Sequence, residues 1–346
     1  MKICHVNLAS GFHGGENQTL LLIKQQLKMG YQLTVVANPK SHFYQRVQEL
    51  PCRLIAAKHY LLSHRHCITK DCKLIHVHEG RAIYWALLQH KLYGVPYLIT
   101  RRIDNPLRKK LFSNLAYRNA SALVGLSKEI GKQIHQAYPQ HPLSIIPSSP
   151  ISYPIDKGIV AKLRQRFDNH FLVIHAANML KHKGFDVTIQ AAHKLQTLAP
   201  NIHIALLGDG KERPELEAQA EGLTNISFVG KQNDMGNWFA AANLLIHPSY
   251  SEGLGSVILE AMGSGLPVIG TQAGGIPDII DHNISGLLIP PGDGEALADA
   301  IINIAQNAVL RDKLAEGRVK KIATFDIKYT SKLYQTLYES ILNKEC

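Results

Sequence analysis

The sequence predicts an α/β protein built from two Rossmann-like, doubly wound parallel-sheet domains. The chain has 346 residues, which is long for one domain and comfortable for two. In both halves, short β-rich runs alternate with helical stretches, as in parallel sheets covered by helices on both faces. Between the halves, Ile146–Ile155 contains three prolines and is the best linker candidate, because proline continues neither helix nor sheet.

The first half begins with a predicted strand at Lys2–Leu8, a glycine loop at Gly11–Gly15 and a helix at Glu16–Met29. Its remaining strands are predicted at Gln32–Ala37, Leu74–Val77, Tyr97–Thr100, Ala122–Val124 and Leu143–Ile146. These elements define an N-terminal domain at residues 1–150.

The second half repeats this alternation. Its strands are predicted at Phe171–Ala176, His203–Leu207, Ile226–Val229, Leu244–His247 and Pro267–Gly270. Its helices are predicted at Phe185–Leu198, Pro214–Ala220, Met235–Ala242 and Val257–Gly263, with two or three more after Gly294. We place the second domain at residues 151–325, followed by a C-terminal helix at 326–346 that could pack back on the first domain. Ligands are expected in the cleft between the domains, at the carboxyl ends of the strands.

Composition favours a cytoplasmic protein. The cysteines are few and odd in number, which indicates a reducing compartment and no disulfide framework: Cys4, Cys52, Cys67, Cys72 and Cys346. The N-terminal Met-Lys-Ile-Cys-His-Val predicts a strand and not a signal peptide. No apolar run approaches the roughly 18 residues of a membrane span.

Charge is distributed unevenly along the chain. Residues 1–150 carry 20 Lys and Arg against 6 Asp and Glu, a net charge of +14, whereas the rest carries 18 against 21, a net charge of −3. The asymmetry indicates that the first half meets a phosphorylated glycan, an anionic membrane surface or nucleic acid. The alternative is that its lysines only keep the protein in solution.

Several histidines and cysteines of the first half are candidate metal ligands: His64, His66, Cys67, Cys72, His76 and His78. Their spacing matches no zinc pattern, although His76 and His78 alternate along a strand and should share one face. The chain also lacks an Asp-x-Asp motif. We therefore predict no metal site.

The stretch Ser251–Glu260 is the most informative part of the chain. Its two carboxylates stand eight residues apart, and Gly253, Leu254 and Gly255 follow the first. A glycine loop can offer backbone N–H groups to a diphosphate, and the following helix points its positive N-terminal end at the same anion. Glu252 would lie near an attached sugar, and Glu260, about two turns along the helix, could accept hydrogen bonds from ribose hydroxyls.

The order Glu-Gly-x-Gly-x-x-x-x-Glu resembles the donor-site motif of retaining, nucleotide-sugar-dependent glycosyltransferases of family four. Glycine pairs after other strands resemble the same family, although each pair alone could be a plain turn. The glycines that by this resemblance approach the donor are Gly14, Gly15, Gly208, Gly210 and Gly274.

A second motif, His182–Asp186, resembles the family's Lys-Gly-hydrophobic-Asp segment. The resemblance places Lys183 on the diphosphate leaving group, where a cation stabilises the developing charge. Many members carry an arginine five residues earlier, where this chain has Asn178. Either Lys181 or the basic first domain could supply the second charge.

The resemblance assigns the acceptor to the first domain. His78 and Glu79 follow one predicted strand, and Arg101 and Arg102 follow the next. In much of the family a histidine lies near these arginines, and the arginines found here suit a phosphorylated or carboxylated acceptor. His78 could equally be a buried structural histidine. Ser127 is expected to cap a helix.

The resemblance implies the GT-B fold and transfer of a sugar from a nucleoside-diphosphate sugar, most simply UDP- or GDP-linked, with retention and without a metal or cofactor. Glu252, Lys183 and His78 are the expected catalytic residues. The expected acceptor is an anionic glycan or lipid-linked glycan, such as lipopolysaccharide core. Peripheral contact with the inner face of the cytoplasmic membrane is expected, and no nucleic acid. Epimerase, phosphorylase and non-catalytic binding protein remain alternatives, and a dehydrogenase is disfavoured because the G-x-G-x-x-G fingerprint is missing.

Overall fold

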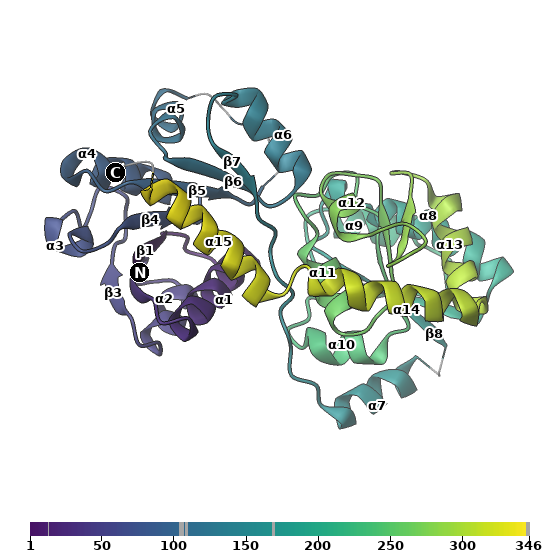
Figure 1. Ribbon diagram of the computed structural model, residues 1–346. Coiled ribbons are helices and arrows are strands. Elements are labelled where there is room, and N and C mark those ends of the chain that lie inside the picture. The colour runs from purple at the N-terminus through teal and green to yellow at the C-terminus, as the bar shows by residue number, and fades with distance from the viewer. Residues whose placement is uncertain (13, 104–106, 108–109, 168–169, 344–346) are drawn as a thin grey trace. The chain divides into compact units, whose positions relative to one another are not determined.

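The structure is a computed structural model of residues 1–346, and it describes all of them except 13, 104–106, 108–109, 168–169 and 344–346. The chain divides into a first unit, Met1–Ser149 with Asp326–Cys346, and a second unit, Pro150–Phe325 (Figure 1). The predicted glycine loop contains His13 and the cysteine set contains Cys346, and both lie outside the described residues.

The first unit holds a seven-stranded parallel sheet in the order β3-β2-β1-β4-β5-β6-β7. Its strands are β1 (Lys2–Asn7), β2 (Gln32–Ala37), β3 (Arg53–Ala56), β4 (Leu74–Val77), β5 (Tyr97–Arg101), β6 (Ala122–Gly125) and β7 (Leu143–Ile145). Its helices are α1 (Gly14–Lys28), α2 (His42–Gln48), α3 (His66–Thr69), α4 (Ala82–Tyr93), α5 (Leu111–Arg118), α6 (Lys128–Ala137) and α15 (Ile327–Leu342).

The C-terminal helix α15 belongs to the first unit. Asp326 begins it by accepting a hydrogen bond from the backbone N–H of Lys328. Its buried residues Tyr334, Tyr338 and Ile341 recur at helical spacing and join the hydrophobic core beneath the sheet, next to α1. The last segment of the chain therefore completes the core of the first unit.

The second unit holds a six-stranded parallel sheet in the order β10-β9-β8-β11-β12-β13. Its strands are β8 (Phe171–Ala176), β9 (Ile202–Leu207), β10 (Ile226–Gly230), β11 (Leu244–His247), β12 (Val268–Thr271) and β13 (Leu287–Ile289). Its helices are α7 (Lys157–Arg166), the 3-10 turn η1 (Lys181–Lys183), α8 (Phe185–Leu198), α9 (Arg213–Gln219), α10 (Met235–Ala241), α11 (Ser256–Gly263), α12 (Ile276–Ile279), α13 (Gly294–Gln306) and α14 (Ala308–Ala323).

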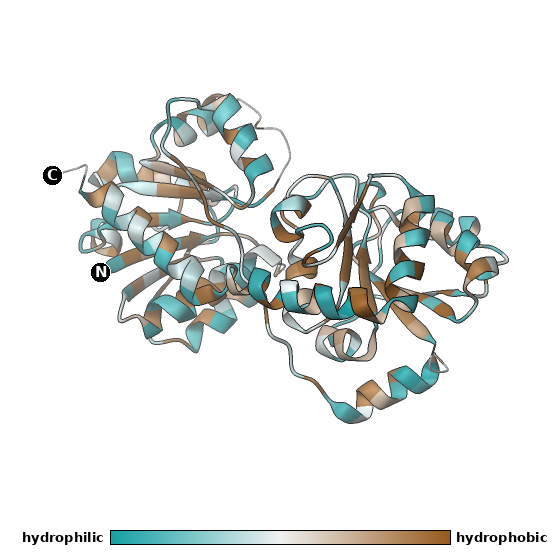
Figure 2. Cartoon of the chain, turned by 45° about the vertical axis from the view of Figure 1, so that its right-hand side comes forward, coloured by the Kyte–Doolittle hydropathy of each residue, from teal (hydrophilic) through white to brown (hydrophobic). Residues whose placement is uncertain are grey.

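The inner strands of both sheets are buried on both faces, as their unbroken apolar sequences predict. Strands β4, β6, β11 and β12 are buried at every residue. Figure 2 shows hydrophobic strands beneath helices whose outer surfaces are largely hydrophilic. The prediction of two Rossmann-like parallel-sheet domains is confirmed. None of the described helices is both long and apolar enough to cross a membrane.

Three details differ from the prediction. The edge strands β3 and β13 were not expected, because β3 is only partly buried and β13 is three residues long. Helix α1 begins at Gly14 and not at Glu16, and neither Gly14 nor Gly15 has a positive φ. The predicted loop therefore ends before these two residues, which form the first turn of α1.

The order in which successive strands are added reverses once in each parallel sheet. In the first unit the connections run outward on either side of β1 and β4, and in the second unit on either side of β8 and β11. Ligands of open parallel sheets bind outside the carboxyl ends of the strands at such a switch point. The segments after β1, β4, β8 and β11 are therefore where functional side chains should be sought.

Candidate functional site

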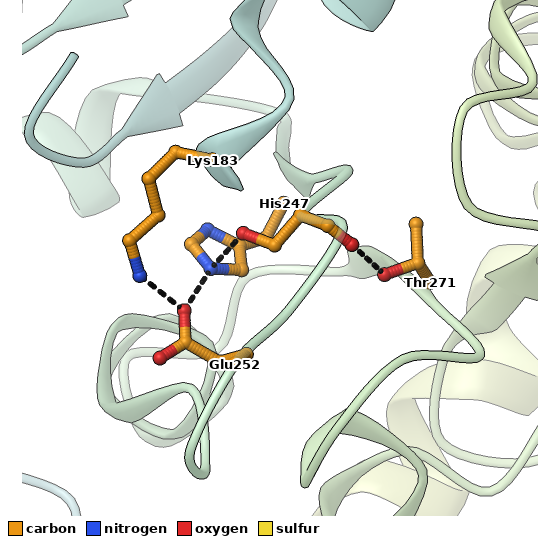
Figure 3. Close-up of polar contacts among 5 residues, drawn as sticks. Lys183, His247, Glu252 and Thr271 are labelled. Carbon is orange, nitrogen blue, oxygen red and sulfur yellow. Dashed lines mark hydrogen bonds and ion pairs between the residues drawn. The ribbon is translucent and has the colours of Figure 1, made fainter. Parts of the chain in front are cut away.

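The second unit places Lys183 and Glu252 together at its switch point. Lys183 lies on η1 after β8, and Glu252 follows β11. The Lys183 Nζ lies 2.6 Å from Glu252 Oε2 (Figure 3), and their side chains are 18% and 16% exposed. The structure thus brings two predicted catalytic residues into one partly buried ion pair.

A histidine that sequence reasoning missed completes this cluster. His247 is the last residue of β11, and its Nε2 lies 2.8 Å from the same Oε2 of Glu252. Ser249 Oγ lies 3.0 Å from that Nε2, and the Ser249 carbonyl accepts a 2.6 Å hydrogen bond from Thr271 Oγ1 (Figure 3). Since a carboxylate only accepts, Nε2 of His247 donates to it.

The cluster keeps Glu252 ionised. Burial raises the pKa of its carboxyl, but the hydrogen bonds and charges of His247 and Lys183 outweigh burial and lower the pKa to about 2. Glu252 is therefore a fixed hydrogen-bond acceptor near neutral pH and not a proton donor. A group of this kind can orient the hydroxyls of a bound sugar.

The glycines of the second unit lock neighbouring loops together. Gly208, after β9, has φ of +142°, and a Cβ there would overlap the carbonyl oxygen of Ala177 after β8. Gly210 lies in the same way against the carbonyl oxygen of Met179. These two glycines therefore have a packing reason for their identity, and their contact with a donor stays a prediction.

Gly274 ties the loop after β12 to Glu252. It has φ of +55°, a Cβ on it would overlap the carbonyl oxygen of Glu252, and the next N–H, of Gly275, donates to that oxygen at 2.8 Å. The backbone that carries Glu252 is thus held by the loop after β12 while its side chain is held by Lys183 and His247.

Helix α11 begins one residue earlier than predicted. Gly255 is its N-cap with φ of +95°, and Ser256 is its first residue. Glu260 is therefore the fifth residue, little more than one turn into the helix, and the expected two turns are wrong. Gly253 and Leu254, between the two glutamates, are buried. The N-terminal N–H groups of α11 follow directly on the segment that holds Glu252.

Glu260 is buried, with 8% of its surface exposed. Burial raises the pKa of its carboxyl to about 7, against a smaller lowering by a hydrogen bond from Tyr153 in the predicted linker. Asn178 and Lys181, the other predicted phosphate-side residues, are exposed. The replacement of the missing arginine by Lys181 stays a prediction.

The first unit gathers its predicted residues near its own switch point. Glu79, after β4, accepts hydrogen bonds from three backbone N–H groups, those of Leu8 after β1 and of Arg81 and Ala82 at the start of α4. Both its oxygens are therefore engaged in joining β1, β4 and α4, which gives Glu79 a structural role. The predicted Ser127 cap is confirmed, since Ser127 accepts from the N–H of Ile130 at the start of α6.

His78 is buried and stands at one end of a hydrogen-bonded chain. Arg102 Nη2 lies 3.4 Å from His78 Nδ1, and His78 Nε2 lies 2.9 Å from His5 Nδ1 on β1. His5 Nε2 lies 2.8 Å from Gln26 Oε1 on α1, and the Gln26 amide donates to Tyr338 OH on α15 at 3.1 Å. The predicted catalytic histidine is thus connected to the C-terminal helix.

The chain continues back to the sheet. Tyr338 OH lies 2.7 Å from His76 Nδ1, His76 Nε2 lies 2.8 Å from Thr100 Oγ1, and Thr100 Oγ1 lies 3.1 Å from Tyr334 OH. The rings of His76 and His78 lie 3.9 Å apart, so the prediction that they share a face is confirmed.

The direction of the hydrogen bonds from Arg102 through His78 and His5 to Gln26 follows from one group. A guanidinium only donates, so His78 Nδ1 accepts and His78 Nε2 carries the proton. His5 must then donate onward, which places its ring proton on Nε2 as well. Arg102 therefore determines the tautomers of His78 and His5. The Gln26 amide donates to Tyr338, and the Tyr338 hydroxyl then donates its proton to His76 Nδ1, so the ring proton of His76 is also on Nε2.

These histidines are held neutral. Burial lowers the pKa of His5 to about 4 and lowers the pKa of His76 and of His78 well below the usual value. His5, His76 and His78 also form a group close enough to hold a metal ion. All six of their ring nitrogens already have hydrogen-bond partners and the group contains no carboxylate, so a cation would have to break the chain.

Known proteins resemble this chain in sequence. Residues 170–307 match the family "Glycosyl transferases group 1". The N-acetyl-alpha-D-glucosaminyl L-malate synthase of Bacillus anthracis is 31% identical over half of this chain and 46% of its own length. The lipopolysaccharide core biosynthesis glycosyltransferase LpsE of Rhizobium meliloti is 28% identical over 72% of this chain and 71% of its own length.

Solved structures share the fold over nearly the whole chain. Anabaena HepE, crystallised with UDP and glucose, gives a TM-score of 0.82 at 22% identity and covers 98% of this chain and 100% of its own. Sucrose-phosphate synthase of Thermosynechococcus elongatus gives 0.78 at 18% identity and covers 99% and 100%. At these identities the likeness establishes the fold.

The packing of loops around Glu252 can be tested by comparing Gly274→Ala with Gly222→Ala. Both glycines have positive φ, so both variants bear the left-handed strain of about 1–2 kcal/mol. Only at Gly274 would the new Cβ meet backbone, whereas Gly222 has open space. In urea denaturation we expect Gly274→Ala to lose at least about 2 kcal/mol more of the free energy of unfolding. Equal losses would contradict the packed arrangement.

The tautomers can be read from the ring nitrogen shifts of the histidines by NMR at neutral pH. We expect His5, His76 and His78 each to carry the proton on Nε2. Tyr338→Phe, which removes the hydroxyl between Gln26 and His76, should cost about 1–3 kcal/mol of the free energy of unfolding. Tyr329→Phe, on the exposed side of the same helix, is the control. A proton on Nδ1 of His78, or equal effects of the two variants, would disprove the chain.

Proposed function

We propose that this glycosyltransferase, whose residues 170–307 form a glycosyl transferases group 1 domain, is a retaining enzyme that uses a nucleoside-diphosphate sugar. It transfers the sugar to a hydroxyl of an anionic glycan or glycolipid. The observation that carries the proposal is the cluster of Lys183, Glu252 and His247 at the β8/β11 switch point, followed directly by the N-terminus of α11.

The cluster suits the departure of a diphosphate. As the bond from the anomeric carbon to the phosphate oxygen breaks, negative charge grows on that oxygen. Lys183 and the N–H groups of α11 supply positive charge for it, so the proposed reaction needs no metal. The acceptor oxygen forms the new bond to the anomeric carbon, and its proton passes to the leaving phosphate.

The two glutamates have separate roles in the proposal. Glu252, ionised and held by Lys183 and His247, accepts hydrogen bonds from the hydroxyls of the transferred sugar and fixes its orientation. Glu260 accepts hydrogen bonds from the ribose. UDP is the first nucleotide to test, because HepE, which shares the fold, was crystallised with UDP and glucose.

The acceptor is assigned from the first unit. Its net charge favours an anionic molecule, and Arg102 is a half-buried guanidinium whose Nε has no hydrogen-bond partner within the described part of the chain. Arg101, at the end of β5, is the neighbouring cation. The similarity to LpsE supports lipopolysaccharide core or a related envelope glycan, reached from the inner face of the cytoplasmic membrane.

Donor binding can be measured by calorimetric titration of UDP, GDP, ADP and CMP without added metal. We expect one of them to bind at micromolar concentration. Glu260→Ala should weaken its binding about tenfold to a hundredfold, because ribose hydroxyls lose a buried charged acceptor. Glu316→Ala, an exposed glutamate on α14, is the control. No binding by any nucleotide would overturn the proposal.

The pKa of Glu260 predicts how this binding depends on pH. Since the ionised carboxylate is the better acceptor and its pKa is raised to about 7, affinity should fall as pH drops below about 7 and level off above it. Glu260→Gln should remove this part of the dependence. The diphosphate of the nucleotide also titrates near pH 6, but its contribution to the pH dependence is the same for the wild type and for Glu260→Gln. Identical pH profiles of the two proteins would exclude Glu260 as the titrating acceptor.

A further inference from the structure

Helix α5 of the first unit exposes an apolar face. Leu111 is 79% exposed, Phe112 69% and Leu115 43%. They stand at positions i, i+1 and i+4, so they share one side of the helix. The opposite side is anchored, because Ala116 and Tyr117 are buried and the Ala116 carbonyl accepts a hydrogen bond from Tyr97 on β5. An apolar cluster held rigidly toward solvent is typical of an interaction site.

Exposed positive charge lies at both ends of this face. Lys110 and Arg118, at the two ends of α5, are exposed. Between Glu79 and Glu129 the chain carries nine lysines and arginines and one acidic residue, Asp104. The partner must therefore accept apolar side chains in the middle and offer negative charge around them.

A phospholipid surface has this combination, with acyl chains below anionic headgroups. Lysine and arginine can stay at the headgroup level while their neighbours insert. Protein interfaces, by contrast, are depleted of lysine, and a second copy of this chain would bring like charges together. We propose that α5 docks the protein on an anionic membrane, with Leu111, Phe112 and Leu115 inserted between the headgroups.

The position of α5 gives this contact a use. Helix α5 follows β5, at whose end Arg101 and Arg102 lie. Docking through α5 would hold that end of the sheet near the membrane, where the reactive hydroxyl of a lipid-linked acceptor is found. The inference rests on the proposed function only for this last step, because the contact itself needs no catalysis.

The test is co-sedimentation of the full chain with vesicles of phosphatidylcholine alone or mixed equally with phosphatidylglycerol. We expect binding to the mixed vesicles only, weakened when salt is raised from about 0.1 M to 1 M. The double variant L111S/F112S should lower the partition coefficient about tenfold or more. V309S/V319S on α14 is the matched control, since these valines are 79% and 63% exposed and lie among charges of both signs.

Three outcomes would overturn the inference: no binding to the mixed vesicles, equal binding by L111S/F112S and wild type, or equal losses in both double variants. If the wild type does not bind vesicles but forms a dimer in sedimentation velocity, and L111S/F112S is a monomer, the face is an interface between two copies of this chain. Nucleotide titration of the same proteins separates this inference from the proposed function. Nucleotide binding without vesicle binding would overturn the membrane contact alone, and the reverse would overturn the donor assignment alone.

Discussion

A parallel sheet brings the carboxyl ends of all its strands to one edge, and a crevice for a ligand opens there at the point where the strand order reverses. This constraint accounts for the placement of residues that are far apart in sequence. Lys183 and Glu252 are separated by 69 residues, yet they form an ion pair because β8 and β11 are neighbours. His5 and His78 meet for the same reason between β1 and β4.

The two units hold polar groups in different electrostatic states. In the second unit the ionised Glu252 is partly buried between Lys183 and His247. The contacts with both partners offset the free-energy cost of removing its charge from water. Removing either partner would leave a charge with fewer contacts, which is strongly unfavourable in such surroundings. The glycine contacts at Gly208 and Gly274 keep the supporting loops close enough for this geometry.

Much of the fold followed from the sequence, because strands buried on both faces are unbroken apolar runs bounded by turn residues. The strands at Gln32–Ala37, Leu74–Val77, Phe171–Ala176 and Leu244–His247 were predicted to the residue. The edge strand β3 was missed because burial, which produces the apolar pattern, is weaker there, and β13 was missed because it has only three residues. The start of α11 was predicted one residue too late. The helix begins after the left-handed Gly255, and the apolar pattern does not mark its first residue, Ser256.

The residues of the site could be predicted only where they belong to a local sequence motif. Lys183, Glu252 and Glu260 stand in recognisable local patterns, whereas their partners do not. His247 had one usable signal, its place at the carboxyl end of a buried strand five residues before Glu252. Tyr338 had none, because its contact with Gln26 joins residues 312 positions apart and depends on the packing of α15.

The neutral histidines of the first unit determine which groups can meet an anionic acceptor. His5 has a folded pKa below its unfolded value, so its contribution to stability is present above about pH 6.5 and is lost as pH falls toward 4. The shift corresponds to about 3 kcal/mol. Near neutral pH the imidazoles therefore carry no charge, and the positive charge at this edge of the sheet comes from guanidinium groups. Since arginine does not titrate in this range, attraction of an anionic acceptor to Arg101 and Arg102 should depend on the acceptor's own ionisation and not on that of these two residues.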